Sequence, residues 1–174
     1  MNRKRFCIAS ALGLLFMAGS LSAQEKPFSF EMGVNYPMGL QKNGFEENRL
    51  GFFLGGEYRL PQTKLGLNLH LSYESYTVFP IGDALAYNGR SIALIPSLSY
   101  WFKGVGKIKP YAAIGVGVSV ENIGTGVFNE GYACHLAVVP KIGLRVVKHI
   151  DLFAQYYVSH RDFSRLIIGC GYVF

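Results

Sequence analysis

The sequence predicts an all-β fold: an eight-stranded antiparallel transmembrane β-barrel, an up-and-down meander that follows a cleaved signal peptide. Three observations carry this prediction. Apolar and polar residues alternate with a period of two through most of the chain, which indicates strands with two unlike faces. The alternating segments number eight, an even number that suits a closed bacterial barrel. Their connections are alternately short and long, as in barrels with turns at one rim and loops at the other.

Composition excludes several other classes of protein. The chain has 174 residues, of which 50% are hydrophobic and 16% are charged. A soluble domain carries about 25% charged residues, so an ordinary cytosolic globular protein does not fit. The apolar content excludes disorder. Beyond the N-terminus there is no apolar run of about 18 residues, which excludes a helical membrane protein with several spans.

The N-terminus has the pattern of a secretory signal peptide. Basic residues at positions 3–5 precede an apolar stretch over 6–17, and small residues lead up to Ala23. We therefore expect a signal peptide over 1–23, with one barrel domain over 24–174. The alternative is a short membrane anchor that is not removed.

Removing the signal peptide changes the charge balance. It takes away three of the 17 Lys and Arg and none of the 11 Asp and Glu, which leaves a net charge of +3. No cluster of basic residues is interleaved with aromatic residues, so we expect no nucleic-acid partner. Cys134 and Cys170 both fall on the outward face, and an intervening strand separates their strands. That places them about 10 Å apart, beyond the roughly 7 Å limit for a disulfide, so free thiols are expected.

The eight expected strands share one pattern, in which one parity is aliphatic or aromatic and the other is mostly Gly, Ser, Asn or charged. In chain order they cover residues 28–36, 50–60, 65–74, 91–102, 114–120, 135–146, 150–159 and 165–174. The apolar parity of the first four is carried by Phe28, Phe30, Met32, Val34, Tyr36, Leu50, Phe52, Leu54, Tyr58, Leu60, Leu65, Leu67, Leu69, Leu71, Tyr73, Ile92, Leu94, Leu98, Tyr100 and Phe102. That of the last four is carried by Ile114, Val116, Val118, Val120, Leu136, Val138, Ile142, Leu144, Val146, Ile150, Leu152, Tyr156, Val158, Leu166, Ile168, Tyr172 and Phe174.

Two of these strands contain an internal proline on the apolar parity. Pro96 and Pro140 each remove one hydrogen bond from a β-ladder, which is unusual in a central strand. We expect a bulge or a local kink at both positions.

The connections divide into two sets. Short ones lie at 61–64, 103–107 and 147–149, and long ones at 37–48, 78–89 and 121–131, with 160–163 on the long side but short. Function on a rigid scaffold tends to lie in loops. The apolar loop residues that could contact a ligand or partner are Phe45, Phe79, Tyr87 and Phe128. The alternative is that they pack together as a lid over the barrel mouth.

The polar parity is expected to face the lumen. It is rich in Gly, Ser and Asn, whereas a water-facing surface normally needs more Lys and Glu. Its charged and histidine residues form a nearly balanced set: Glu31, Glu57, Arg59, His70, Glu74, His135, Lys141, Arg145, Asp151 and Arg165. An eight-stranded barrel has room inside for side chains only, so we expect a plug of ion pairs. The two histidines lack a convergent third ligand, so no metal and no cofactor are expected.

The chain also carries a family resemblance, which covers nearly all of the part that follows the expected signal peptide. Residues 95–102, 109–117 and 140–145 and the closing Gly-Tyr-Val-Phe resemble the small outer-membrane β-barrel domain family, OmpA/OmpX-like and porin-like, especially the versions common in Bacteroidota. Tyr172 and Phe174 resemble the terminal signal read by the outer-membrane assembly machinery. The resemblance implies an integral protein of the cell outer membrane, with membrane lipid and that machinery as its partners.

Aromatic residues near the expected strand ends fit this placement. Such residues form girdles at the two membrane interfaces of a barrel. They are Tyr58, Tyr73, Tyr100, Phe102, Tyr156 and Phe174.

The function we expect is structural or adhesive, with extracellular loops as the interaction surface and no catalytic residue. A narrow porin-like channel or small-ligand binder is one alternative. A lipid A-modifying enzyme is another, with Ser159, His160, Asp162 and Ser164 as local candidates, although His160 is not followed by a serine two residues later. A soluble secreted barrel that binds a hydrophobic ligand would instead need an apolar lumen.

Overall fold

The computed structural model describes residues 27–38, 44–80, 87–125, 128–159 and 164–174. The side chains of 44–48, 78–80, 87–88, 123–125 and 128–131 lie outside this description, as does the expected signal peptide. In the described part of the chain, no helix is long and apolar enough to cross a membrane.

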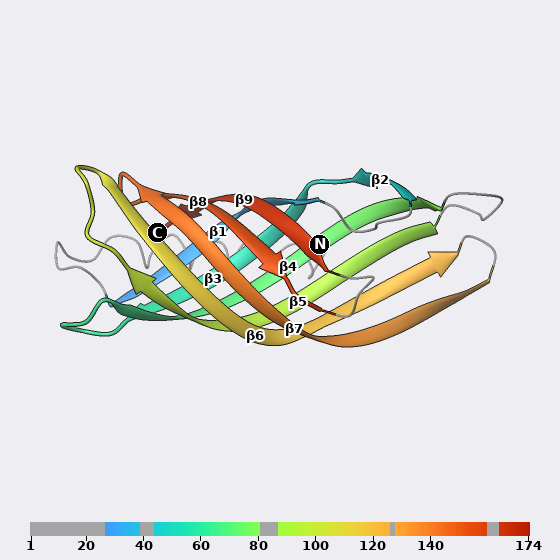
Figure 1. Ribbon diagram of the computed structural model, residues 1–174, viewed down its shortest axis with the longest axis horizontal. Helices are drawn as coiled ribbons and strands as arrows, with labels where there is room; N and C mark the ends of the chain where they lie inside the picture. The colour runs from blue at the N-terminus through green and yellow to red at the C-terminus, as the bar shows by residue number, and fades with distance from the viewer. Residues whose placement is uncertain (1–26, 39–43, 81–86, 126–127, 160–163) are drawn as a thin grey trace, which may run out of the picture.

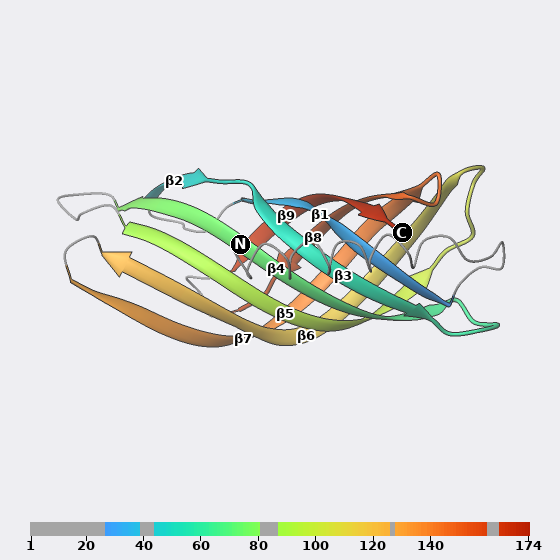
Figure 2. The same ribbon diagram turned by 180° about the vertical axis from the view of Figure 1, so that it is seen from behind.

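The chain forms one closed antiparallel sheet (Figures 1 and 2). Its strands are β1 (Phe28–Met38), β2 (Gly44–Asn48), β3 (Gly51–Arg59), β4 (Leu65–Pro80), β5 (Tyr87–Trp101), β6 (Ile108–Thr125), β7 (Phe128–Val146), β8 (Ile150–Tyr157) and β9 (Arg165–Val173). The sheet order is β2-β4-β3-β1-β9-β8-β7-β6-β5, and β5 pairs with β4 to close the ring. Because β2 and β3 pair with successive parts of β4, the barrel wall has eight strand positions, and the predicted fold class is confirmed.

The ends of the barrel differ in the way the sequence predicts. The short connections, at 60–64, 102–107 and 147–149, lie at one end, here named the turn rim, together with the start of β1 and the end of β9. The opposite end is the loop rim. Chain closure is made by β1 and β9, which pair from Glu31 with Val173 to Met38 with Leu166.

The expectation of about ten residues per strand is wrong for one side of the barrel. The strands β4, β5, β6 and β7 have 16, 15, 18 and 19 residues, whereas β1, β3, β8 and β9 have 11, 9, 8 and 9. The extra residues come from the connections expected at 78–89 and 121–131, where pairing continues as far as Thr125 with Phe128. Ladder formation needs only main-chain partners, and β-branched and aromatic residues there favour it. In Figure 1 these four strands extend past the ends of β8 and β9.

The bulges expected at the two prolines are also absent from the described ladders. Pro96 pairs with Leu69 of β4, and the β5–β6 ladder resumes beyond it in the same register. Pro140 pairs with Ile114 in a regular ladder. The register shift of the β6–β7 ladder lies instead between Ile123 and Thr125. A proline that loses one hydrogen bond in a closed sheet is held in register by the neighbouring strands.

The two faces of the wall are chemically opposite. Outward side chains are apolar and exposed, with Leu50 at 64%, Phe52 at 62% and Ile142 at 65% of their full surface. Inward side chains are buried, and along β9 buried and exposed residues alternate at every position. An exposed apolar surface of this extent marks a membrane or interaction face. The core of the fold is therefore its lumen.

Inward glycines make room for inward aromatic rings. Gly169 is the direct partner of Phe153 in the β8–β9 ladder, and a Cβ added there would lie 2.2 Å from the Phe153 ring. Gly143 stands in the same relation to Tyr111 of β6, with a distance of 2.4 Å. A side chain at either glycine would displace a ring from the lumen.

Candidate functional site: the barrel interior

The lumen is filled in three layers between the turn rim and the loop rim. A charged layer lies near the turn rim, an aromatic and aliphatic layer lies in the middle, and a second charged layer lies toward the loop rim. Inward residues from all eight wall positions contribute, because each strand points alternate side chains inward.

Glu57 of β3 is the centre of the first layer. Its carboxylate accepts hydrogen bonds from Arg145 Nη1 at 2.8 Å and from Trp101 Nε1 at 2.7 Å. Arg59 Nε lies 3.5 Å from the same carboxylate. Both guanidinium groups also stack on the Trp101 ring, at 4.1 Å for Arg59 and 4.7 Å for Arg145. Glu57 and Trp101 therefore hold two cations at the turn rim.

Asp151 of β8 forms a second group in the same layer. It accepts a hydrogen bond of 2.6 Å from the Tyr111 hydroxyl and lies 4.0 Å from Lys141 Nζ. Lys141 also lies 3.8 Å from the centre of the Phe153 ring. Cation–π contacts of this kind strengthen when the groups are removed from water.

A small cavity of about 40 Å³ adjoins both groups, with Glu31, His70, Lys141 and Gln155 among its lining residues. That volume is room for about three water molecules, and it is too small for a solute. Buried polar atoms without a protein partner face this region, including Glu31 Oε1, His70 Nε2 and Gln155 Nε2. Because buried polar atoms need hydrogen bonds, the cavity is suited to bound water.

The middle layer separates the two charged layers. Phe53 and His70 stack with ring centres 4.8 Å apart, and Phe153 meets Phe53 edge to face at 5.1 Å. Next to these rings lies an aliphatic cluster with Ile95, Val139 and Ile167. Side chains pack the lumen at this level, as expected for a barrel of eight strands.

Arg165 of β9 is the centre of the second charged layer, and it is 1% exposed. Its Nε donates to Glu74 of β4 at 2.6 Å, and its Nη1 donates to Glu121 of β6 at 2.9 Å. Its Nη2 donates to the Ser91 hydroxyl of β5 at 2.7 Å. One side chain thus joins the last strand to three strands across the lumen.

Glu121 collects further hydrogen bonds. Its carboxylate accepts from Ser91 at 2.9 Å, from Ser119 at 2.8 Å and from the Tyr76 hydroxyl at 3.0 Å. Four donors therefore meet one carboxylate that is fully buried, which satisfies the requirement that a buried charge be paired and hydrogen-bonded.

The structure brings most of the expected lumen residues together. Arg59 and Arg145 share the carboxylate of Glu57. Lys141 pairs with Asp151 beside Glu31, and Glu74 pairs with Arg165. His70 lies in the aromatic layer rather than in an ion pair. His135 lies on β7, opposite Ser119 in the β6–β7 ladder.

Sequence reasoning missed several members of the charged layers. Expected strands of about ten residues leave Glu121 in a connection, yet it continues the inward parity of Ser119. Trp101, Tyr76 and Ser91 were likewise not assigned to a site. Each lies on the inward parity of its strand and is buried, and that parity is the signal that could have identified them.

The expected loop contacts lie outside the described side chains, since Phe45, Phe79, Tyr87 and Phe128 are described only as parts of strand backbones. Of the residues weighed for lipid A modification, His160 and Asp162 lie outside the description. The Ser164 hydroxyl donates to the Ser159 carbonyl at 3.3 Å, and the Ser159 hydroxyl donates to the Leu136 carbonyl at 3.3 Å. Among described residues, no group of three His, Cys, Asp or Glu could hold a metal ion.

The C-terminal aromatic residues point outward at the turn rim. Tyr172 is 48% exposed and stacks on His149, with ring centres 5.5 Å apart. Phe174 meets Tyr172 edge to face at 4.9 Å, and its backbone N–H donates to the Phe30 carbonyl at 2.8 Å. Cys134 and Cys170 are free and exposed on the outer faces of β7 and β9.

Solved structures with the same architecture come from small surface barrels. The Ail attachment invasion locus protein of Yersinia pestis, in complex with the heparin analogue sucrose octasulfate, shares 14% identity and a TM-score of 0.52, over 84% of this chain and 97% of that one. Neisserial surface protein A shares 12% identity and a TM-score of 0.56, over 84% and 96%. The outer membrane protein OprG of Pseudomonas aeruginosa shares 14% identity and a TM-score of 0.51, over 84% and 95%.

These likenesses concern the fold. No protein-family model and no curated protein sequence matches the chain. The resemblance to OmpA/OmpX-like domains of Bacteroidota therefore stays a prediction, whereas the closed eight-stranded antiparallel barrel is confirmed.

Proposed function

We propose that this chain is an integral outer-membrane barrel of structural or adhesive type, whose loop rim faces the exterior and forms the contact surface. The observation that carries the proposal is the inversion of polarity across the wall. Outward side chains on all eight wall positions are apolar and exposed, while the described carboxylates lie inside. In hydrocarbon every main-chain polar group needs an internal partner, and a closed barrel provides one.

The filled lumen favours a structural or contact role over transport. A solute that crossed the barrel would have to pass two charged layers and the aromatic layer around His70. The cavity near the turn rim holds about 40 Å³, which suits water alone. The polar lumen also argues against a soluble barrel that carries a hydrophobic ligand, since such a carrier needs an apolar interior.

The long strands support a contact surface at the loop rim. β4, β5, β6 and β7 extend beyond β1, β3, β8 and β9 on one side (Figure 2), and a hydrocarbon core needs only about 9–11 tilted residues per strand. Their ends therefore stand outside the membrane. Ail, named for attachment and invasion, and a neisserial surface protein have the same barrel, which is consistent with contact at this rim.

Outer-membrane lipid and the assembly machinery are the partners that this proposal requires. The apolar wall meets the lipid, and Tyr172 and Phe174 present exposed rings at the C-terminal end of β9. We propose that these two rings form the signal that the assembly machinery reads.

The first test is electrophoretic mobility of the full-length chain expressed in a Gram-negative host. We expect the protein in the outer-membrane fraction, with different gel mobility before and after boiling, because a closed barrel resists detergent until heated. Protein that stays soluble in the periplasm would refute the membrane placement.

A second test separates the adhesive part of the proposal. Attachment of expressing cells to a protein-coated surface is compared with that of cells whose barrel carries Gly-Ser replacements over 39–43 and 81–86. Equal amounts of heat-modifiable barrel are the control. Loss of attachment supports a contact surface at the loop rim, and unchanged attachment refutes it.

A further inference from the structure

A set of cationic side chains lies at the turn rim. The set, here named the basic rim, comprises Arg59, Lys64, Lys103, Lys107, Lys109 and Lys148. Every Asp or Glu whose side chain is described lies on the inward face: Glu31, Glu57, Glu74, Glu121 and Asp151. Within the described residues, therefore, the charged side chains exposed at this rim are all positive.

Two lumen carboxylates near the turn rim, those of Glu57 and Asp151, already interact with groups inside the barrel. Glu57 accepts a 2.8 Å hydrogen bond from Arg145, whereas Arg59 approaches it only to 3.5 Å and is 30% exposed. Asp151 is committed to Tyr111 and Lys141. The exposed lysines of the basic rim, which are Lys64, Lys103, Lys107 and Lys148, present their charge to the exterior, and an external anion is its complement.

Part of the basic rim surrounds a cleft. The cleft has a volume of about 620 Å³ and lies between the 60–64 turn and the segment after β5. Arg59, Lys64, Lys103 and Lys109 line it together with Trp101 and Phe102. Ligand sites commonly have volumes of about 300–1,000 Å³, so the cleft is large enough for a phosphate-bearing headgroup.

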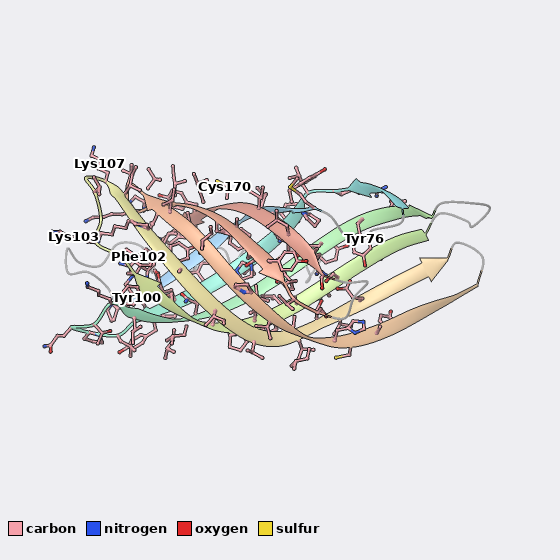
Figure 3. All side chains as sticks on the ribbon, in the orientation of Figure 1. Tyr76, Tyr100, Phe102, Lys103, Lys107 and Cys170 are labelled. Carbon is pink, nitrogen blue, oxygen red and sulfur yellow. The ribbon has the colours of Figure 1, made fainter. Side chains whose placement is uncertain are left out.

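The depth of the basic rim matches a membrane interface. Figure 3 shows Lys103 and Lys107 at the same end of the barrel as Tyr100 and Phe102. Lys64 Nζ lies 6.0 Å from the centre of the Tyr100 ring. Aromatic rings of barrels lie at headgroup level, and lysines with apolar stems extend from that level toward the headgroups. The cations therefore lie where lipid phosphates lie.

One turn keeps a lysine in a conformation that costs free energy. Val147 and Lys148 have φ values of 52° and 66°, in the left-handed region that disfavours side chains with a Cβ. Strain of this kind points to a role for the residues that carry it. Lys148, which is exposed, lies in this turn at the basic rim.

From these observations we propose that the basic rim binds phosphate groups of anionic phospholipids in the periplasmic leaflet, with the cleft beside Lys64 and Lys103 as its main headgroup site. The inference rests on the proposed function, since it requires the turn rim to face the periplasm. A lysine near a membrane surface contributes about 1 kcal/mol to anionic lipid binding, and the attraction weakens as salt is added.

The test uses native mass spectrometry of the full-length protein, purified in a nonionic detergent and titrated with phosphatidylglycerol or phosphatidylcholine. The test variant is Lys64→Gln/Lys103→Gln/Lys107→Gln, three exposed side chains. The matched control is Arg49→Gln/Arg90→Gln, which removes two exposed cations outside the basic rim. We expect the test variant to bind phosphatidylglycerol at least about five-fold more weakly, with phosphatidylcholine binding and the control unchanged.

Three outcomes would overturn the inference. One is equal loss of phosphatidylglycerol binding in the control, and another is no loss in the test variant. The third is co-sedimentation of the protein with peptidoglycan sacculi that the test variant abolishes, which would assign the basic rim to that polymer instead of to lipid. Each protein is first checked for heat-dependent gel mobility. A barrel without that shift refutes the proposed function, whereas a heat-modifiable barrel without lipid preference refutes only this inference.

Discussion

Replacing Arg165 by methionine should destabilise the barrel strongly. The change keeps most of the side-chain volume but removes donors to Glu74 at 2.6 Å, Glu121 at 2.9 Å and Ser91 at 2.7 Å. Two carboxylates, exposed to only 1% and 0% of their surface, then lose their shared cation. Removing one partner of a buried ion pair costs about 3–5 kcal/mol, so the free energy of unfolding should fall by about that amount.

The assay is urea unfolding of the detergent-refolded protein, followed by circular dichroism and by gel mobility. Arg90→Met, which removes an exposed cation of β5, is the matched control and should change stability by less than about 0.5 kcal/mol. The triple variant Arg165→Met/Glu74→Gln/Glu121→Gln should recover more than half of the loss, because the stranded charges are then gone. A single variant as stable as wild type, or a triple variant no better than the single one, would refute the reasoning.

Three further experiments test the packing of the lumen, the strain in one turn and the orientation of the barrel in the membrane. Gly169→Ala should lower the free energy of unfolding, measured by urea titration, by about 1–3 kcal/mol through its clash with Phe153. If adding Phe153→Leu to this variant restores none of the lost stability, the clash is not the cause. Val147→Gly should raise the free energy of unfolding by about 1 kcal/mol, because glycine tolerates the positive φ. A lower free energy of unfolding in the same titration would contradict the claim that Val147 is strained. A membrane-impermeant maleimide applied to whole cells should label Cys134 but not Cys170. Cys134 lies about 12 residues from the turn rim, which places it beyond the hydrocarbon core on the exterior side. Labelling of Cys170 alone would mean the opposite orientation.

Much of the fold follows from the period of two, and the exceptions have physical causes. The parity of residues such as Leu67, Ile142 and Ile168 places them on the outer wall, where they are exposed. Parity cannot give strand length, however, because a ladder continues as long as main-chain partners are available. That is why β6 and β7 extend into the connection expected at 121–131.

The sequence predicts which charged residues lie in the lumen better than it predicts which of them contact each other. Inward parity predicts Glu57, Arg145 and Arg165 as lumen residues, and all three are buried. Parity cannot say, however, which strands face each other across a barrel. The pairing of Arg165 with Glu74 joins residues far apart in sequence. The sequence does not identify Glu121 as a lumen residue, because the expected strand ends before it. The order of the charged and aromatic layers along the barrel depends on the stagger between neighbouring strands, and an alternation pattern does not encode that stagger.

The position of Arg165 on the last strand has a consequence for assembly. Its carboxylate partners belong to β4 and β6, which precede it in the chain. If the strands are added in chain order, Glu74 and Glu121 enter the nascent sheet before their cation does. Their charges are neutralised only when β9 arrives, and β9 is also the strand that pairs with β1 to seal the cylinder. Neutralisation and closure are then one event, because the carboxylates of Glu74 and Glu121 have no Arg165 to pair with until β9 is added.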